Sequence, residues 1–283
     1  MFATASILMR IRHLGDGLPP TARRIATYVA EHADEVIRMS ITEVAEQTGA
    51  SEGSIVGLCR RLGASGFQEL KILLSRDLVE PMQMIHEDLR PSDTVADVAQ
   101  HVFAAHIASL QETQKLLSQK TLARAVEIVR ASKRVEVYGI GSAAPIAQDL
   151  GYRLLQLGYD AKPVTDSHIQ AVSAAMADSG TAVVTVSHSG STQETVMATE
   201  LAKKAGARTI GITRMGKSPL ARHCDVVLHT IANETRYRPE AMSSRVAQLA
   251  IIDTLVSCCA LADAKRSIAR LQLSARVLAA KRF

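Results

Sequence analysis

Hydroxyl side chains gather in one six-residue stretch of the chain, residues 187–192. They are Ser187, Ser189, Ser191 and Thr192, with Gly190 among them. Such a turn suits a phosphate group, because hydroxyls donate hydrogen bonds and a glycine lets the backbone come close. The stretch has no lysine or arginine, so it is not a P-loop. An ordinary loop in which Thr192 only caps a helix is the alternative, but one cap needs only one hydroxyl, and we favour a phosphate site.

A strand and a helix are expected to position this stretch. Residues Ala182–Val186 are largely apolar and rich in β-branched side chains, which is typical of a buried parallel strand. The amphipathic segment Gln193–Lys204 follows directly and is predicted to form a helix. The N-terminus of that helix would offer free N–H groups and the positive end of the helix dipole to an anion.

A second loop, Gly139–Ser142, is predicted to face the first. It follows the predicted strand Arg134–Tyr138 and opens a helix. In a flavodoxin-like sheet, ligands bind where the strand order reverses, between the first and third strands. The spacing Gly139-x-Gly141-x-x-Ala144 also matches the weak dinucleotide fingerprint, with Asp166 as its acidic residue. Because the hydroxyl-rich loop has no role in a dinucleotide site, this alternative ranks second.

Strands and helices alternate over the second half of the chain, which predicts a parallel sheet with helices on both faces. The strands are expected at Arg134–Tyr138, Ala161–Thr165, Ala182–Val186, Arg208–Ile212 and Asp225–His229. The helices are expected at Asp93–Ser118 and Thr121–Ala131, after Ser142, around His168–Met176, at Gln193–Lys204, near Lys217–Arg222, at Ser243–Ala262 and in the basic tail.

The segment before this pattern, residues 19–78, is predicted to be helical and contains the spacing of a helix-turn-helix. Ala45 permits a close helix crossing, and Gly49, four residues later, suits a left-handed turn. Ile55 and Leu58 would anchor the second helix from behind. A plain three-helix bundle with a glycine turn is the alternative, but the joint fit of the four positions favours DNA binding.

The predicted recognition helix runs from about Glu52 to Leu62. Its N-terminal residues are expected to meet base edges, whereas Arg60 and Arg61 are expected to contact phosphates. Residues 1–90 carry a net charge of −2, so this region as a whole is not a basic patch. The candidate DNA-binding residues are Ser51, Glu52, Ser54, Arg60 and Arg61.

Length and composition limit the class of protein that this chain can be. The chain has 283 residues, 47% of them hydrophobic and 22% charged, which fits a globular protein of two domains. The last 21 residues, from Asp263, carry a surplus of five positive charges, equal to the net charge of the whole chain. The four cysteines lack zinc-site spacing, so we expect reduced thiols and no metal. With no signal peptide and no uncharged run of membrane-spanning length, we expect a soluble cytoplasmic protein.

Several motifs together resemble the RpiR family of bacterial transcriptional regulators. They are the helix-turn-helix, the turn over Gly63–Lys71, GIGSA from Gly139, DSH from Asp166, VVTVSHSGSTQET from Val183 and ITRMGKSPLA from Ile212. The family joins an N-terminal helix-turn-helix domain to a sugar isomerase (SIS) domain that binds a phosphosugar. The resemblance covers nearly the whole chain.

The resemblance implies an effector site that includes the hydroxyl-rich stretch Ser187–Thr192, called here the serine loop. In that site, the resemblance implies that the sugar phosphate is held by Ser142, Ser187, Ser189 and Thr192 with the help of the His188 backbone. It also implies that Glu234 or Glu240 lies near the sugar hydroxyls. Many relatives have a basic residue where this chain has Gly57, so a base contact at that position is in question.

We therefore expect an all-α helix-turn-helix domain joined to an α/β flavodoxin-like SIS domain with a parallel sheet. The helix-turn-helix domain is expected over residues 1–78, a linker and connecting helix over 79–110, and the SIS domain over 111–283. The predicted function is a non-enzymatic regulator of carbohydrate catabolism genes that binds operator DNA and a phosphosugar as a homodimer or homotetramer, without cofactor or membrane. A SIS-type sugar-phosphate isomerase is the alternative, because such enzymes use a glutamate or histidine as general base.

Overall fold

The computed structural model describes residues 6–14, 17–78, 92–232 and 243–281. They form two compact units: most of the described residues up to Ala105 belong to the first, and most of those from His106 onward to the second. The predicted linker, Val79–Ser92, lies outside the described residues except at its last position.

The N-terminal unit is helical, as predicted. Its helices are α1 Ile7–Leu14, α2 Pro20–Glu31, α3 Ala33–Val36, α4 Ile41–Thr48, α5 Glu52–Arg61 and α6 Phe67–Leu78. One apolar core joins all six, and it includes the fully buried Ile25, Val29, Ile55 and Leu70. Ile25, Val29, Ala33 and Val36 fall at helical spacing, which predicts a single helix that opens at Pro20 or Thr21. This prediction is wrong, because the chain leaves helical geometry at His32 (φ −122°) and restarts at Ala33. Helix α1 was not predicted.

The helix-turn-helix lies where the spacing places it. Helix α4 begins with a capping box, in which the Glu43 N–H donates to Ser40 Oγ (3.2 Å) and the Ser40 N–H donates to Glu43 Oε2 (2.6 Å). It ends at Gly49, whose φ of +58° is the left-handed conformation that favours glycine. Ala45, Ile55 and Leu58 are buried, so the predicted turn and anchors are confirmed.

The C-terminal unit contains one five-stranded parallel sheet. Its strand order is β2-β1-β3-β4-β5, which is the predicted flavodoxin-like order. The strands are β1 Arg134–Tyr138, β2 Ala161–Val164, β3 Thr181–Val186, β4 Arg208–Arg214 and β5 Val226–Thr230. The helices and 3-10 turns are α7 Val95–Leu116, α8 Gln119–Ala131, η3 Gly141–Ala143, α9 Ala144–Gln156, α10 Ser167–Ala175, α11 Gln193–Lys204, η4 Leu220–His223, α12 Ser243–Ala262 and α13 Ala264–Ala279.

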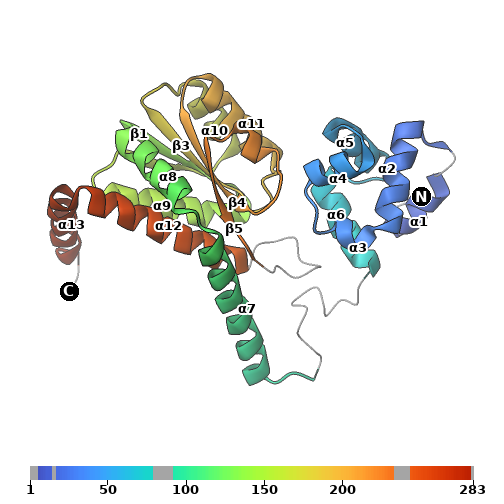
Figure 1. Ribbon diagram of the computed structural model, residues 1–283, viewed down its shortest axis with the longest axis horizontal. Helices are drawn as coiled ribbons and strands as arrows, with labels where there is room; N and C mark the ends of the chain where they lie inside the picture. The colour runs from blue at the N-terminus through green and yellow to red at the C-terminus, as the bar shows by residue number, and fades with distance from the viewer. Residues whose placement is uncertain (1–5, 15–16, 79–91, 233–242, 282–283) are drawn as a thin grey trace. The chain divides into compact units, whose positions relative to one another are not determined.

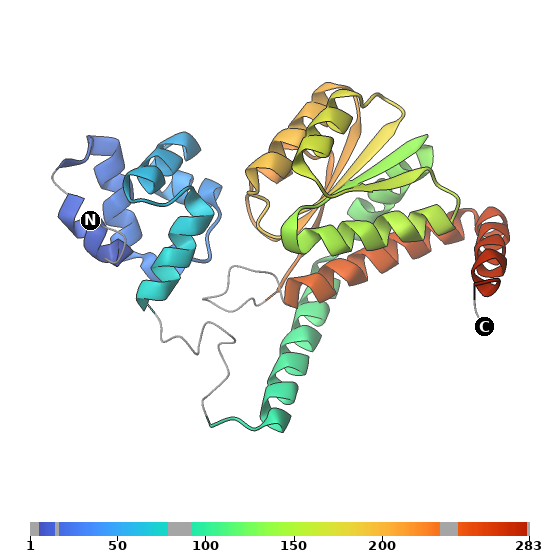
Figure 2. The ribbon, with the colours of Figure 1, turned by 180° about the vertical axis from the view of Figure 1, so that it is seen from behind.

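Helices cover both faces of this sheet (Figures 1 and 2). Helices α8, α9 and α12 pack on one face, over a large core that includes Val137, Leu150, Val184 and Ile252. Helices α10 and α11 pack on the other face, over a smaller core rich in alanine. Strand β3 is central and buried at every residue, as its β-branched sequence predicts.

Helix α12 is the most apolar helix of the unit. Over Ser244–Ala262 it is long and apolar enough to cross a membrane by length and composition alone. Its residues Ile251, Ile252, Leu255 and Cys259 are buried in the sheet core, which is the position of a core helix in a globular unit. By contrast α13, the predicted basic tail helix, is exposed along most of its length.

Candidate anion site and nucleic-acid interface

The two candidate loops leave the sheet side by side. Strands β1 and β3 are direct neighbours, and Tyr138 at the end of β1 pairs in register with Thr185 near the end of β3. The loops that follow therefore start at the same level of the same sheet edge. This is also the point where the strand order reverses, and it is the switch point predicted from the sequence.

Glycine shapes the first of these loops. A Cβ on Gly139 would lie 2.7 Å from the backbone oxygen of Ala143, so only glycine lets the chain turn back this tightly. Gly141 has a φ of +60°, and the 3-10 turn η3 leads from it into α9. Ser142 lies in this turn and is exposed to solvent.

The serine loop is fixed by its neighbours through its carbonyl groups. The backbone N–H of Arg214 and the hydroxyl of Thr213 both donate to the His188 carbonyl, each at 3.1 Å. The N–H of Leu220 donates to the Gly190 carbonyl at 3.0 Å, and Gly190 has a φ of +60°. The backbone is thus held from the side of β4 and η4, and the loop's hydroxyls are not needed to hold it to those elements.

The hydroxyls of the loop differ in what they contact. Ser187 is buried, whereas Ser189 and Ser191 are half-buried. Ser191 bonds back into the loop: its N–H donates to Ser189 Oγ and its hydroxyl donates to the Ser189 carbonyl, each at 3.2 Å. Thr192 is the N-cap residue of α11, yet its side chain makes no capping hydrogen bond. The interpretation in which Thr192 only caps the helix is therefore wrong.

A buried hydroxyl pair holds α11 against the sheet. Thr185 Oγ1 on β3 and Thr199 Oγ1 on α11 lie 2.8 Å apart, and the Thr199 hydroxyl also bonds to the Thr195 carbonyl at 2.7 Å. This contact joins the middle of α11 to β3, the strand that leads into the serine loop. The sequence does not predict this pair, because a threonine within an apolar strand gives no local signal of its partner.

The remaining site residues fall into two groups. Glu240 and Glu234 lie outside the described residues. Asp166, the acidic residue of the dinucleotide alternative, is the N-cap of α10, where its Oδ1 accepts the Ile169 N–H at 2.9 Å. An aspartate that caps its own helix gives no support to a ribose-binding role.

Histidine, cysteine and acidic side chains are the remaining groups that could bind a metal or act as nucleophiles in the part of the chain that the structure describes. There, no group of three or more histidine, cysteine or acidic side chains could hold a metal ion. The four cysteines are free thiols. Burial raises the pKa of Cys59, Cys224 and Cys259 to about 12, so these thiols stay protonated and unreactive at neutral pH.

The candidate DNA-binding residues lie on and before α5. Ser51 is its N-cap, and its hydroxyl accepts the Ser54 N–H at 3.1 Å. The Thr42 hydroxyl on α4 donates to Glu52 Oε1 at 2.6 Å, so Glu52 also joins the two helices of the motif. Arg60 and Arg61 are both exposed in the last turn of α5.

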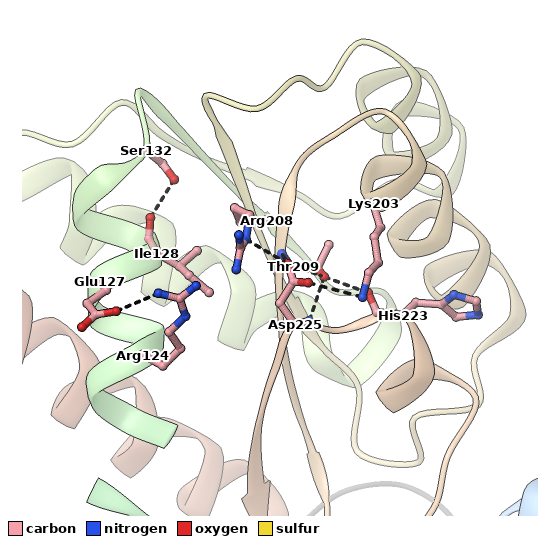
Figure 3. A network of polar contacts seen from close by, with 9 residues as sticks. All are labelled: Arg124, Glu127, Ile128, Ser132, Lys203, Arg208, Thr209, His223 and Asp225. Carbon is pink, nitrogen blue, oxygen red and sulfur yellow. Dashed lines mark hydrogen bonds and ion pairs between the residues drawn. The ribbon is translucent and has the colours of Figure 1, made fainter. Parts of the chain in front are cut away.

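Charged groups lie at the opposite edge of the sheet, where β4 and β5 begin. Asp225, which precedes β5, accepts the Thr209 N–H at 2.9 Å and pairs with Arg208 (3.2 Å) and Lys203 (3.4 Å). Figure 3 shows these side chains converging from β4, from the residue before β5 and from the end of α11, beside a separate Arg124–Glu127 pair on α8. Partial burial raises the pKa of Asp225, but the Thr209 N–H and the two cations outweigh it and hold that pKa below its usual range.

Comparison with known families matches both units. A family model described as a helix-turn-helix domain of the rpiR family matches residues 5–81. A model described as the SIS domain matches residues 128–258.

Individual relatives match over nearly their whole length. An HTH-type transcriptional regulator of Caldanaerobacter subterraneus, TTE0211, is 32% identical over 249 residues, which are 88% of each chain. The HTH-type transcriptional regulator YbbH of Bacillus subtilis is 32% identical over 251 residues, again 88% of each chain. Among solved structures, the Vibrio vulnificus NanR protein complexed with ManNAc-6P is similar, with a TM-score of 0.82 and 28% identity over 98% of this chain and 100% of that one.

Proposed function

The chain belongs to the rpiR family of HTH-type transcriptional regulators, and from this premise we propose that its SIS domain senses a phosphorylated sugar. Binding of the sugar would alter binding of the N-terminal domain to an operator of carbohydrate catabolism genes. A regulator of this kind acts on chromosomal DNA, which supports a location in the cytoplasm.

One observation carries the effector assignment: the Thr192 hydroxyl at the start of α11 is not used as a helix cap. Together with the loop before it, this helix N-terminus offers hydroxyls and backbone N–H groups to an anion. Ser187, His188, Ser189 and Thr192 belong to this loop, and Ser142 belongs to the loop beside it. The similarity to NanR, which was solved with ManNAc-6P, supports a phosphosugar over a free nucleotide.

A thermal-shift panel tests this assignment. N-acetylmannosamine 6-phosphate is the first probe, followed by other hexose and amino-sugar phosphates, with inorganic phosphate and unphosphorylated sugars as controls. A ligand that binds only the folded state raises the apparent stability by mass action. We expect one sugar phosphate to raise the Tm well beyond the effect of inorganic phosphate. No shift with any member of a broad panel would contradict the proposal.

We further propose that binding occurs without isomerisation. The match to full-length regulators over 88% of their length supports a sensor rather than an enzyme. NMR of the protein incubated with aldose and ketose phosphates measures any interconversion directly. Turnover that a glutamate substitution abolishes would favour the isomerase alternative.

On the DNA side, we propose that α5 enters the major groove. Ser51, Glu52 and Ser54 lie at its N-terminal end, where such helices meet base edges, and Arg60 and Arg61 would contact phosphates. A single motif of this size contacts one half-site, so we propose a dimer or a dimer of dimers on an inverted repeat. Footprinting together with sedimentation tests this: one asymmetric half-site bound by a monomer would contradict it.

A further inference from the structure

Two arginines from outside the helix-turn-helix bond to the turn before the recognition helix α5 and to the residue that ends it. Arg24 lies on α2, and its Nε donates to the Thr48 carbonyl at 2.6 Å while its Nη2 donates to the Gly49 carbonyl at 3.1 Å. Arg10 lies on α1, and its Nη1 donates to the Leu62 carbonyl at 2.9 Å. Leu62 is the C-cap residue of α5.

The carbonyls that Arg24 contacts are the ones that α4 leaves without helical partners. The last carbonyls of a helix have no N–H further along to bond, and they carry the negative end of the helix dipole. A guanidinium suits them because its planar fork makes two hydrogen bonds in a fixed direction. Gly49 has left-handed backbone geometry and leads within two residues to Ser51, the cap of α5. Fixing the Gly49 carbonyl therefore fixes the direction in which α5 starts.

At the other end of α5, Arg10 passes directly beside a glycine. Gly63 has a φ of +85°, and a Cβ at this position would lie 3.1 Å from Arg10 Nη1. The turn after α5 therefore favours glycine both for its backbone conformation and for the space that the arginine occupies. Neither arginine lies on α5 itself, so neither contact adds a group to the face that reads bases.

We propose that Arg24 and Arg10 are positioning residues for DNA reading, with Arg24 setting the start of the recognition helix and Arg10 its end. The inference rests on the proposed role of α5 in the major groove. Base readout depends on the angle at which the helix enters the groove, whereas attraction to the phosphate backbone does not. Loss of a positioning residue should therefore reduce the preference for one sequence more than the affinity for DNA in general.

The test uses the full chain and two duplexes. The first duplex is the tightest one selected by the wild-type protein from a random 30-base-pair library, and the second is a scrambled version of it. Fluorescence anisotropy over a salt series gives Kd and its salt slope for Arg24→Ala, Arg24→Lys and wild type. Arg23→Ala is the matched control, because it removes an equal charge from the same helix, and Arg23 contacts the Leu18 carbonyl instead of the turn.

We expect Arg24→Ala to weaken binding to the selected duplex about tenfold and to the scrambled duplex less than about twofold, with an unchanged salt slope. Arg24→Lys should recover part of the loss, since an ammonium restores the charge but not the fork. Arg23→Ala should affect both duplexes to the same small extent. Arg10→Ala should resemble Arg24→Ala.

Three outcomes would overturn the inference. An equal loss on both duplexes with the salt slope lower by about one unit would make Arg24 a phosphate contact. A lower Tm with unchanged binding to both duplexes would make it a purely structural residue. If Arg24→Ala fails to fold, Arg24→Lys decides, and wild-type selectivity in this variant would contradict the role of the fork. A wild-type chain that selects no duplex at all would instead contradict the proposed function, and the role of Arg24 that rests on it would fall with it.

Discussion

The two edges of the five-stranded sheet are built from different side chains. At the edge where strands begin, Asp178 precedes β3 and Asp225 precedes β5. Each accepts a backbone N–H, and Asp178 also accepts the Thr181 hydroxyl at 2.9 Å. At the edge where strands end, the loops after β1 and β3 carry serines and threonines instead.

If the serine loop binds the effector as proposed, this difference separates residues that stabilise the fold from residues that bind the ligand. At the first edge the two aspartates accept hydrogen bonds from nearby backbone N–H groups and, for Asp178, from a threonine hydroxyl. These carboxylates are therefore engaged in holding the fold together. At the second edge the backbone carbonyls of His188 and Gly190 hold the loop, and the Thr192 hydroxyl does not cap its helix. Substitutions at the beginning of the strands should therefore change the free energy of unfolding, and substitutions in the serine loop should change ligand affinity.

The largest expected effect comes from Gly139 in the loop after β1, where the chain turns back closely on itself. Gly139→Ala places a Cβ 2.7 Å from the Ala143 carbonyl oxygen, and the backbone must shift to relieve it. We expect a loss of about 3 kcal/mol in the free energy of unfolding, at the upper end of overpacking effects. Urea denaturation measures it. Gly57→Ala is the control, since a Cβ there meets nothing within 4 Å and should stabilise α5 by up to about 1 kcal/mol.

The next effect tests the edge where the strands begin. Asp225→Ala removes the acceptor of the Thr209 N–H and the partner of two cations, so we expect about 2 kcal/mol less stability by urea denaturation. Effector affinity measured by calorimetry should stay within twofold. A large loss of affinity with full stability would contradict the division between the edges.

The converse change is made in the serine loop. Thr192→Ala should weaken binding of the sugar phosphate by about 1.4 kcal/mol, a tenfold rise in Kd, because one hydrogen bond to a charged group is lost. Stability without ligand should change by less than about 0.5 kcal/mol, since this hydroxyl caps nothing. Ser257→Ala, an exposed serine on α12, controls for loss of a hydroxyl elsewhere. Equal affinity of the Thr192 variant and wild type would remove the hydroxyl from the site.

The smallest effect is a pH dependence. The pKa of Asp225 is lowered in the folded state, so its contribution is complete above the unfolded-state pKa of about 3.9 and is lost as the pH falls through the lower folded value. Asp225→Asn should therefore lower stability at pH 7 and show a shallower loss than wild type below about pH 4. Urea midpoints from pH 2.5 to 7 measure this. Parallel curves for the two proteins would show that the carboxylate charge is not involved.

Much of this arrangement could be predicted because it depends on local spacing. Ala45, Gly49 and Ile55 lie within one motif, and a strand followed by a serine loop and a helix is contiguous in the chain. The topological rule for parallel sheets then brought the loops after β1 and β3 together.

Contacts between distant residues could not be predicted. Arg24 meets Thr48, Arg10 meets Leu62 and Thr185 meets Thr199, yet each of these residue types is common in any helix or strand. The break at His32 was missed for a related reason, because the apolar positions keep helical spacing across it. Local patterns record which face of an element is buried, whereas these contacts depend on which elements become neighbours.

The uncapped start of α11 has a consequence for how the protein moves. A side-chain cap stabilises the first turn of a helix by about 1 kcal/mol, and Thr192 does not supply one. A bound phosphate would act as that cap, so the first turn should open more often in the free protein than in the complex. Amide hydrogen exchange at Gln193–Thr195 should then slow several-fold on binding, while exchange near Lys203 at the far end of the same helix stays unchanged.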